Sequence, residues 1–429
     1  MNVKEYLNNF FKGTKNPSLD AMKYFINEYN DFEKEMKFIH VAGTNGKGSC
    51  VEMISNILVK QGDKVGKFIS PHLIRYNERI SINGIEITDD EIAKIIEELQ
   101  PKIEQYNKTN NIPVTFFELE TIMALLYFYR EKVDFVILET GLGGLYDCTN
   151  IVSKPLVSLI SSIGYDHMHI LGNTLEEIAY QKAGIIKKNS NTVIIEQEEN
   201  VNDVFKKVCE ERNNELHLIS KTKIKNYKID STYQYFDYGK YKDIAIILKG
   251  KKQIENACLC IETINILNLL GYTVSEKAIR EGLKTVIHKG RMETLSDNPL
   301  IIFDGAHNEP AIRNLKDMVE MYYNDKKVIY IISILKRKDY RKMLDILLQN
   351  SNAHFIFTSG NDVEKYTSKD ELYKYANSVN KDIDVNRMEL NDAIEFAFNS
   401  KSKENIFLVI GSFYVYGDVK EQVVRNLKQ

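Results

Sequence analysis

The ten residues from His40 to Ser49 (HVAGTNGKGS) combine glycines, a lysine and a hydroxyl, the residue types that bind phosphate groups. They follow a short apolar run and precede a helical pattern, and a loop in that position can surround phosphate oxygens with backbone N–H groups. Lys47 would supply a cation for the β- and γ-phosphates, and the Ser49 hydroxyl would reach Mg²⁺. The match to the general phosphate-loop pattern is incomplete, because Val41 occupies the first glycine position and Gly48 separates Lys47 from Ser49.

The alternative to a phosphate loop is an ordinary glycine-rich turn between a strand and a helix. A lysine and a hydroxyl at this spacing favour phosphate binding. We therefore expect ATP to be bound by Gly43, Thr44, Asn45, Gly46, Lys47, Gly48 and Ser49.

Two further charged residues suggest ligand chemistry. Glu139 ends a second apolar run, and open α/β sheets place their ligand sites at the carboxyl ends of strands. A carboxylate there can hold Mg²⁺, which prefers oxygen ligands. Arg79 is our candidate for binding an acidic substrate, because a guanidinium can clamp a carboxylate with two hydrogen bonds. Pairing of Arg79 with Glu78 or Glu86 is the alternative.

The loop HVAGTNGKGS resembles the nucleotide loop of the folylpolyglutamate and dihydrofolate synthases, relatives of the muramyl-peptide ligases. Segments similar to that family's other motifs follow in the same order along almost the whole chain, which is more specific than any single motif. They are SPHL (70–73), YNERI (76–80), ETGLGG (139–144), DCTN (147–150), SIGYDH (162–167), QKAGI (181–185), GRME (290–293), DGAHN (304–308) and GSFY (411–414).

This resemblance implies an ATP-dependent ligase that activates a carboxylate as an acyl phosphate and joins it to L-glutamate. By resemblance, Ser49, Ser70, Glu139 and His167 hold Mg²⁺, and Lys182 is carbamylated, which turns a cation into an oxygen ligand for a second metal ion. Potassium is a further candidate cofactor. Without the resemblance, His167 reads equally well as a turn histidine, and Lys182 reads as a solvated surface lysine.

The resemblance also implies which residues bind ATP and substrate elsewhere in the chain. For the nucleotide they are Asn256, Arg291, Asp304 and His307, with Asp304 suited to the ribose hydroxyls. For the substrate they are His72, Arg79, Ser412 and Tyr414. The substrates expected are a reduced folate or dihydropteroate, L-glutamate and ATP. The chain departs from the family pattern at Leu145 and Tyr146, which bears on the folate substrate and not on ligase chemistry.

These residues must be positioned by an α/β fold. Apolar runs ending near residues 43, 70, 139, 164 and 197 alternate with helical patterns, which predicts a doubly wound, mainly parallel sheet of the P-loop type. Short alternating segments at 220–252 predict a small antiparallel addition. Ser296–Pro299 is the expected linker, so we predict an ATP-binding domain over 1–295 and a smaller, Rossmann-like α/β domain over 300–429.

Charge and composition narrow the classes of partner. The 429 residues carry 57 Lys and Arg against 60 Asp and Glu, and this net charge of −3 argues against a nucleic-acid binder. The five scattered cysteines suggest free thiols in a reducing compartment. No apolar run is long enough to span a membrane, and the first residues do not resemble a signal peptide. We therefore expect a cytoplasmic monomer without nucleic-acid or membrane partners.

Two rival functions stay open from the sequence. A muramyl-peptide ligase would use the same chemistry, but those enzymes carry a domain for the nucleotide-sugar before the ATP loop, and only about forty residues precede Gly43. A non-catalytic ATP-binding regulatory protein is the second rival, and the metal-type residues Glu139 and His167 speak against it. Dihydrofolate synthase and folylpolyglutamate synthase activities share the motifs above, and we expect at least polyglutamylation.

Overall fold

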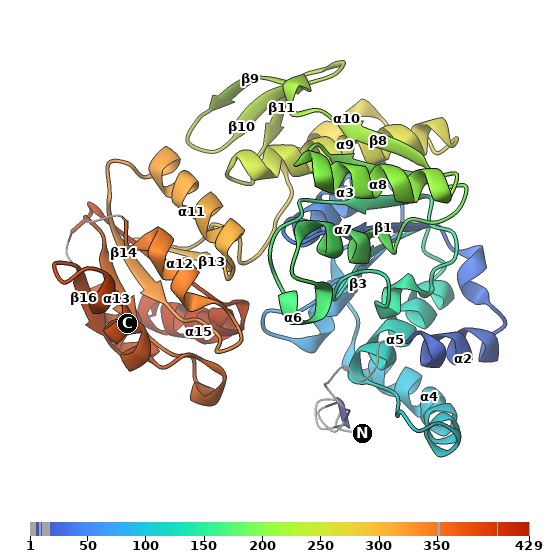
Figure 1. The fold of residues 1–429 in the computed structure, drawn as a ribbon, viewed down its shortest axis with the longest axis horizontal. Helices are drawn as coiled ribbons and strands as arrows, with labels where there is room; N and C mark the ends of the chain where they lie inside the picture. Colours follow the sequence, from blue (N-terminus) through green and yellow to red (C-terminus); the bar gives the residue numbers. More distant parts are fainter. Residues whose placement is uncertain (1–5, 8–9, 11–17, 350–351, 401, 429) are drawn as a thin grey trace. The chain divides into compact units, whose positions relative to one another are not determined.

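The structure, a computed structural model, describes residues 6–7, 10, 18–349, 352–400 and 402–428 (Figure 1). These residues divide into two compact units. The first lies within residues 1–247 and 251–287, and the second within residues 248–250 and 288–429.

An eight-stranded sheet in the order β4-β3-β2-β5-β1-β6-β7-β8 organises the first unit. In this order, the neighbouring strands from β2 through β5, β1, β6 and β7 to β8 pair in parallel. At the other end of the sheet, β3 pairs antiparallel with β2 and with β4. Their bounds are β1 Phe38–Ala42, β2 Val65–Phe68, β3 Ile80–Ile82, β4 Ile85–Glu86, β5 Phe135–Glu139, β6 Val157–Ile160, β7 Asn191–Ile195 and β8 Glu215–Ile219. The strand before the phosphate loop, β1, therefore lies inside the sheet between β5 and β6.

Helices cover both faces of this sheet. Every residue of β1 is buried, and Phe38 and Ala42 join core clusters formed with α4, α5, α7 and α8. Ile39 and Val41 point to the opposite face by the alternation of a strand, where α3 and α9 contact the sheet. The helices are α2 Asp20–Glu28, α3 Lys47–Gln61, α4 Asp89–Thr109, α5 Phe116–Arg130, α6 Met168–Leu171, α7 Leu175–Ala183, α8 Glu199–Glu211, α9 Lys251–Leu269 and α10 Glu276–Lys284.

Capping boxes set the start of three of these helices. The hydroxyls of Thr88, Thr115 and Thr174 each accept the backbone N–H three residues later, and a glutamate at that position reaches back to the threonine. Glu118 is one of these glutamates, so the carboxylate next to Phe116 and Phe117 caps α5. Short 3₁₀ turns complete the unit: η1 Phe32–Glu35, η2 Tyr76–Arg79, η3 Cys148–Ile151 and η4 Lys221–Lys223.

A three-stranded antiparallel sheet, in the order β11-β10-β9, is a separate layer of the first unit (Figure 1). Its strands are β9 Ile224–Ile229, β10 Gln234–Tyr238 and β11 Tyr241–Ile246. It packs through β11 against α10, and Tyr238 and Tyr241 bond to side chains of α9. This is the small antiparallel addition expected from the sequence.

The second unit has a six-stranded sheet in the order β12-β13-β17-β14-β15-β16, parallel except for β12. The strands are β12 Glu293–Asp297, β13 Leu300–Asp304, β14 Lys327–Ile332, β15 His354–Phe357, β16 Asp384–Arg387 and β17 Asn405–Ile410. The helices and turns are α11 Glu309–Tyr322, α12 Tyr340–Leu347, η5 Val363–Lys365, α13 Lys369–Val379, α14 Leu390–Asn399, η6 Phe413–Val415 and α15 Tyr416–Leu427.

The predicted fold class is confirmed, and one local expectation is wrong. Ser296–Pro299 is not a linker, because Ser296 and Asp297 belong to β12 and pair with β13 in the second sheet. The division between the units falls instead between Ile287 and His288. Within the first forty residues, the described helical elements before β1 are α2 and η1, and most of residues 1–17 lie outside the described part of the chain.

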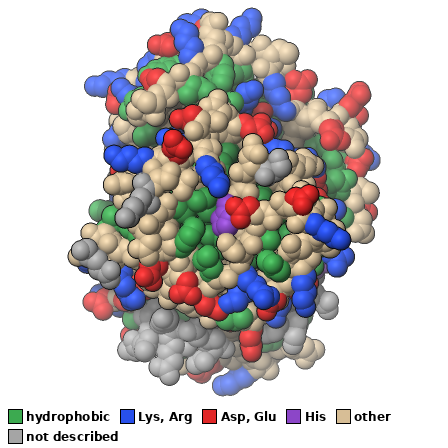
Figure 2. Space-filling view, turned by 90° about the vertical axis from the view of Figure 1, so that its left-hand side faces the viewer, with side chains coloured by type: hydrophobic (Ala, Val, Ile, Leu, Met, Phe, Trp, Pro, Cys, Tyr) green, Lys and Arg blue, Asp and Glu red, His purple; other side chains and the backbone are tan. Residues whose placement is uncertain are grey.

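The surface agrees with the balanced composition. Figure 2 shows acidic and basic side chains interspersed over one face, with apolar side chains gathered around a single histidine. None of the described helices is both long and apolar enough to cross a membrane.

Candidate active site

The glycine-rich loop leaves β1 and enters α3 at Lys47, as its sequence predicts. Hydrogen bonds tie it to the segment after β6. The Thr44 N–H donates to the Ser162 carbonyl (2.8 Å), and the Thr44 hydroxyl bonds to both the N–H (3.1 Å) and the carbonyl (3.0 Å) of Gly164. These bonds from the segment after β6 help to hold the loop in shape.

Asn256, on the first turns of α9, lies directly against this loop. Gly46 has a φ of +95°, and a Cβ there would lie 2.7 Å from the Asn256 Oδ1, so the position needs glycine. The Asn256 side chain is buried, and its Nδ2 donates a hydrogen bond to the Gln253 Oε1 at 3.1 Å. Ser49, in the first turn of α3, is buried as well.

Two lysines donate to one carbonyl oxygen of the loop. The Nζ of Lys47 lies 3.0 Å from the Gly43 oxygen, and the Nζ of Lys182 lies 2.9 Å from the same oxygen. Lys182 is buried and is not the solvated lysine that its sequence context allowed. Burial, followed by the charge of Lys47, lowers the pKa of Lys182 from 10.5 to about 7, although Asp166 and Asp147 act in the opposite direction. Its amine is therefore neutral in a large fraction of molecules at neutral pH.

A close backbone approach brings Lys182 to the loop. The Leu145 N–H donates to the Gln181 carbonyl of α7 at 2.8 Å. A Cβ on Gly144 would lie 2.9 Å from the carbonyl oxygens of both Gln181 and Lys182, so the loop after β5 can touch α7 only with glycine at this position. The close packing of this loop against α7 thus explains why Gly144 is a glycine, which the sequence motif alone did not reveal.

The expected metal ligands lie at strand and helix ends of the first unit. Glu139 is the last residue of β5 and is buried, and its Oε2 accepts the Ser70 N–H at 3.4 Å. His167 is the N-cap residue of α6 with a φ of 51°, and its Nε2 lies 3.8 Å from the Asp166 Oδ1.

These donors fit a magnesium ion that is shared with a nucleotide. Within the described residues, no three His, Cys, Asp or Glu side chains group closely enough to form a metal cage. Magnesium in nucleotide sites is usually held by one or two carboxylates together with phosphate oxygens and water. One buried carboxylate, Glu139, and one buried hydroxyl, Ser49, match that pattern.

A buried polar network that the sequence reasoning missed supports the loop after β5. The Nε2 of His40 bonds to the Thr149 hydroxyl (2.8 Å), which bonds to the Asp147 Oδ1 (2.5 Å). The other Asp147 oxygen accepts the Leu142 N–H at 2.7 Å. Because the Thr149 hydroxyl donates to the carboxylate, His40 must donate through Nε2. Burial, and secondarily Lys187, lowers the pKa of His40 to about 3, so this imidazole is neutral.

Arg79 makes neither of the pairings considered from the sequence. Its Nη1 lies 2.8 Å from the Oε2 of Glu120, which is fully buried on α5, and its Nε donates to the His72 Nδ1 at 2.8 Å. Glu78 instead accepts backbone N–H groups of residues 73–75, and Glu86 lies 4.0 Å from Arg75. Arg79 therefore orients His72, and the pairings with Glu78 and Glu86 were wrong.

The second unit brings Arg291 and His307 to one aromatic ring, and Asp304 bonds to the turns that carry them. The Arg291 guanidinium lies 4.6 Å from the centre of the Phe413 ring, and the His307 ring lies 5.7 Å from it. The Asp304 oxygens accept the N–H groups of Met292 (3.0 Å) and Ala306 (2.9 Å). Burial raises the Asp304 pKa, and Arg291 opposes this rise. Asp304 thus joins the turn that carries Arg291 to the turn that carries His307.

Ser412 and Tyr414 follow β17 in the same unit. The buried Ser412 hydroxyl accepts the Tyr414 N–H at 3.1 Å and caps η6. Half of the Tyr414 side chain is exposed, and Arg337 lies 5.9 Å from its ring centre. Of the two, only Tyr414 presents its side chain to solvent.

The order and geometry of these segments match known proteins along the whole chain. The Mur ligase middle domain matches residues 41–264, and the dihydrofolate synthetase C-terminal domain matches residues 289–422. A dihydrofolate synthase/folylpolyglutamate synthase of Bacillus subtilis is 36% identical over 414 residues, which cover 95% of each chain. This chain belongs to that family.

Solved structures of the family agree. The folylpolyglutamate synthase of Thermotoga maritima aligns over 100% of this chain and 98% of its own, with a TM-score of 0.84 and 31% identity. Escherichia coli FolC, solved with DHPP and ADP, aligns over 99% of this chain and 97% of its own, with a TM-score of 0.84 and 27% identity. The predicted family is therefore confirmed, and with it an amide-forming ligase of the Mur ligase type.

Proposed function

We propose that this chain adds L-glutamate to the γ-carboxylate of tetrahydrofolates and also to dihydropteroate, in both cases through an acyl phosphate. The observation that carries the proposal is the loop at Gly43, where Lys47 and Lys182 meet beside the strand that ends in Glu139. Relatives support the choice of substrate: E. coli FolC was solved with DHPP and ADP, and an FPGS that is 26% identical was solved with AMPPCP and folate.

In this reaction ATP phosphorylates the substrate carboxylate, because a free carboxylate is a poor electrophile. Backbone N–H groups at the start of α3 face the phosphates, and Lys47 exchanges its bond to the Gly43 carbonyl for one to a phosphate oxygen. The glutamate amine then attacks the acyl carbon, phosphate leaves, and an amide forms. Lys47 and the helix N-terminus stabilise the charge that spreads over the transferred phosphoryl group.

We propose that Ser49, Ser70, Glu139 and His167 would hold Mg²⁺, which would supply positive charge to the phosphates of ATP. We further propose that Lys182 is carbamylated. Its neutral amine would attack the carbon of CO₂ and release one proton, leaving an N-bound carbamate that can ligate a second ion. A pKa of about 7 supports this step, because a lysine with its ordinary pKa is almost fully protonated at neutral pH. Potassium as a cofactor, a monomeric state and a cytoplasmic location stay predictions.

Nucleotide and substrate contacts complete the proposal. We assign Asn256, Arg291 and His307 to ATP, and His72 and Tyr414 to the acidic substrates. Asp304, Arg79 and Ser412 would act by positioning, because the Asp304 oxygens and the Ser412 hydroxyl accept backbone N–H groups, and Arg79 pairs with Glu120.

The test is glutamate-dependent release of ADP from ATP, measured in parallel with dihydropteroate, with tetrahydrofolate, with a muramyl-peptide precursor and without acceptor. We expect turnover with the first two acceptors only. Turnover with the muramyl-peptide precursor alone would indicate a muramyl-peptide ligase, and ATP binding without turnover would indicate a regulatory protein. Lys47→Ala should abolish turnover, whereas Lys60→Ala, an exposed lysine on the same helix, should leave it unchanged.

A further inference from the structure

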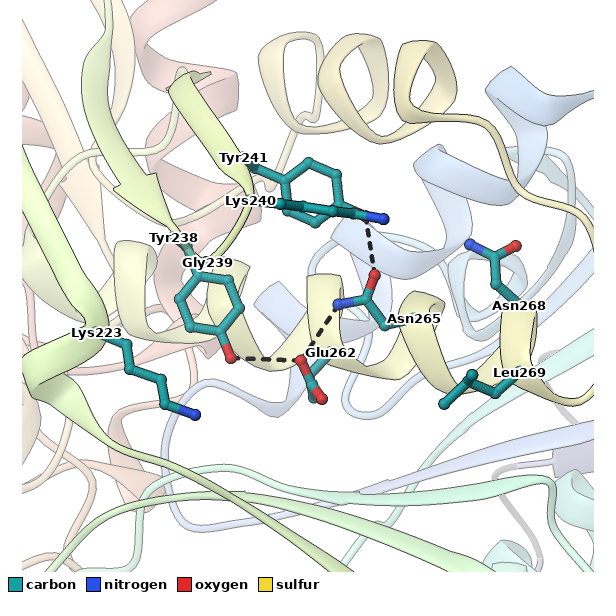
Figure 3. Close-up of a pocket in the computed structure, with 9 residues that line it drawn as sticks. All are labelled: Lys223, Tyr238, Gly239, Lys240, Tyr241, Glu262, Asn265, Asn268 and Leu269. Atoms are coloured by element: carbon teal, nitrogen blue, oxygen red, sulfur yellow. Dashed lines mark hydrogen bonds between the residues drawn. The ribbon is translucent and has the colours of Figure 1, made fainter.

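A hollow of about 440 Å³ lies in the first unit between the β10–β11 hairpin and the outer side of α9 (Figure 3). None of the groups assigned to ATP or substrate lines it. Its lining residues are Lys223, Tyr238, Gly239, Lys240, Tyr241, Glu262, Asn265, Asn268 and Leu269. The volume falls in the range of about 300–1,000 Å³ that small-molecule sites occupy.

The polar groups on the floor of this pocket are joined to one another. The Tyr241 hydroxyl donates to the Asn265 Oδ1 at 2.8 Å, and the Asn265 Nδ2 donates to the Glu262 Oε2 at 3.2 Å. The Tyr238 hydroxyl donates to the same oxygen at 3.4 Å, and the His217 Nδ1 lies 3.9 Å from the other one. Figure 3 shows these bonds as dashed lines that link Tyr238, Glu262, Asn265 and Tyr241 in one chain.

The walls, in contrast, bear cations. Lys223 and Lys240 are exposed, and no ion pair to either is found among the described residues. The Lys240 Nζ lies 5.2 Å from the Tyr241 ring centre. The segment 221–247 that forms this layer holds six lysines and three aspartates in a chain whose net charge is −3. One of those aspartates, Asp237, is paired with Lys242 at 3.4 Å.

Two cations that flank a floor of carboxylate and amide groups suit a ligand of a particular pattern. The ligand should carry carboxylates for Lys223 and Lys240 and, between them, an amide N–H that Glu262 or Asn265 can bond. An oligo-γ-glutamyl chain has this pattern, with one free carboxylate per residue and one amide in each link. We propose that the pocket binds the γ-glutamyl tail of a polyglutamylated ligand, an inference that rests on the proposed function for the source of the tail.

The helix α9 connects this pocket to the phosphate loop. Asn256, near its start, contacts Gly46, and Glu262 to Leu269 line the pocket six to thirteen residues later. At 1.5 Å per residue, these positions lie roughly 9–20 Å further along the helix axis. The pocket is thus separate from the phosphate loop but on the same rigid element, and we expect it to affect long-tailed substrates and not those with one glutamate.

Isothermal titration of penta-γ-glutamate, which lacks a pterin, into the full chain tests the proposal without ligase activity. We expect Lys223→Ala and Lys240→Ala each to weaken binding by roughly 2- to 5-fold, since exposed ion pairs contribute modestly. Lys225→Ala, in the same layer but outside the pocket, is the charge-matched control and should bind like wild type. Leu269→Glu should weaken binding by charge repulsion, and Leu269→Gln should not.

Three outcomes would overturn the assignment: no binding by wild type, equal loss in Lys225→Ala, or equal affinity for penta-α-glutamate. The last would indicate a site for acidic peptides of a protein partner. Turnover of a substrate with one glutamate should be unchanged in Lys223→Ala and Lys240→Ala. If wild type lacks glutamate-dependent turnover altogether, the proposed function fails, while the titration still tests the pocket.

Discussion

Replacing Lys182 with methionine should stabilise the first unit near neutral pH and at the same time remove the ligase activity. Lys182 is buried on α7, and burial together with Lys47 lowers its pKa to about 7. A methionine has a similar length and no charge. The variant therefore keeps the packing of this position and loses the cost of burying a cation.

The size of the effect follows from the pKa. A fall from 10.5 to about 7, at about 1.4 kcal/mol per pKa unit, corresponds to an unfavourable contribution of about 5 kcal/mol at pH values below 7. The variant also loses the hydrogen bond to the Gly43 oxygen, about 1–3 kcal/mol, although Lys47 still donates to that oxygen. The difference is a net gain of about 2–4 kcal/mol in the free energy of unfolding at pH 6.

The sign of the pH dependence is fixed by proton binding. Between about pH 7 and pH 10.5 the unfolded chain keeps the Lys182 proton and the folded chain has released it, so this group makes the wild type more stable as pH rises. The variant lacks that rise. Its advantage should therefore be largest at pH 6 and should shrink steadily through pH 9.

Urea unfolding in CO₂-free buffer at pH 6, 7, 8 and 9 measures this difference, with peptide-level hydrogen exchange to identify the transition of the first unit. Lys188→Met, an exposed lysine after α7, is the matched control and should change little at any pH. A variant less stable than wild type at pH 6, or an advantage that does not depend on pH, would refute the reasoning.

Three further substitutions test the contacts around the site. Gly144→Ala should destabilise the first unit by about 1–3 kcal/mol in urea and lower kcat, since its Cβ would press on two carbonyl oxygens of α7; an unchanged kcat would contradict this. Arg79→Met should cost about 3–5 kcal/mol because it removes the cation from a buried ion pair with Glu120, and adding Glu120→Leu should restore most of that loss. Asp304→Asn should lower the unfolding free energy of the second unit by about 1–3 kcal/mol, because one backbone N–H loses its acceptor, and should raise the KM for ATP more than it lowers kcat.

Much of the fold could be predicted from the sequence because the local patterns of apolar and polar residues agree with the tertiary structure. The apolar run before Gly43 and the helical pattern after Lys47 predicted β1, the loop and α3. The pattern Thr115-Phe-Phe-Glu118 fits a capping box, and this local reading would have identified the role of Glu118. The hairpin at Ser296–Pro299 was mistaken for a linker because polar turn residues look alike in both settings.

Contacts between side chains that are distant in the sequence were harder to predict. Glu120 lies 41 residues after Arg79 on a nearly fully buried helix, so nothing local indicated their ion pair. The bond from His40 to Thr149 spans 109 residues and forms only because β1 and β5 are neighbours in the sheet. Lys182 looked like a surface residue because its exposure depends on how closely Gly144 lets α7 approach.

The bonds between Thr44 and the segment at Ser162 and Gly164 have a consequence for the thermodynamics of nucleotide binding. A loop that had to fold around its ligand would lose conformational entropy at that moment, at about 1–2 kcal/mol for each backbone residue fixed. Here part of that entropy is lost when the chain folds, because the bonds from Ser162 and Gly164 hold Thr44 in place. The free energy gained from contacts to the phosphates can then contribute to affinity and to holding the γ-phosphate in line for attack, because little of it offsets the entropy cost of ordering the loop.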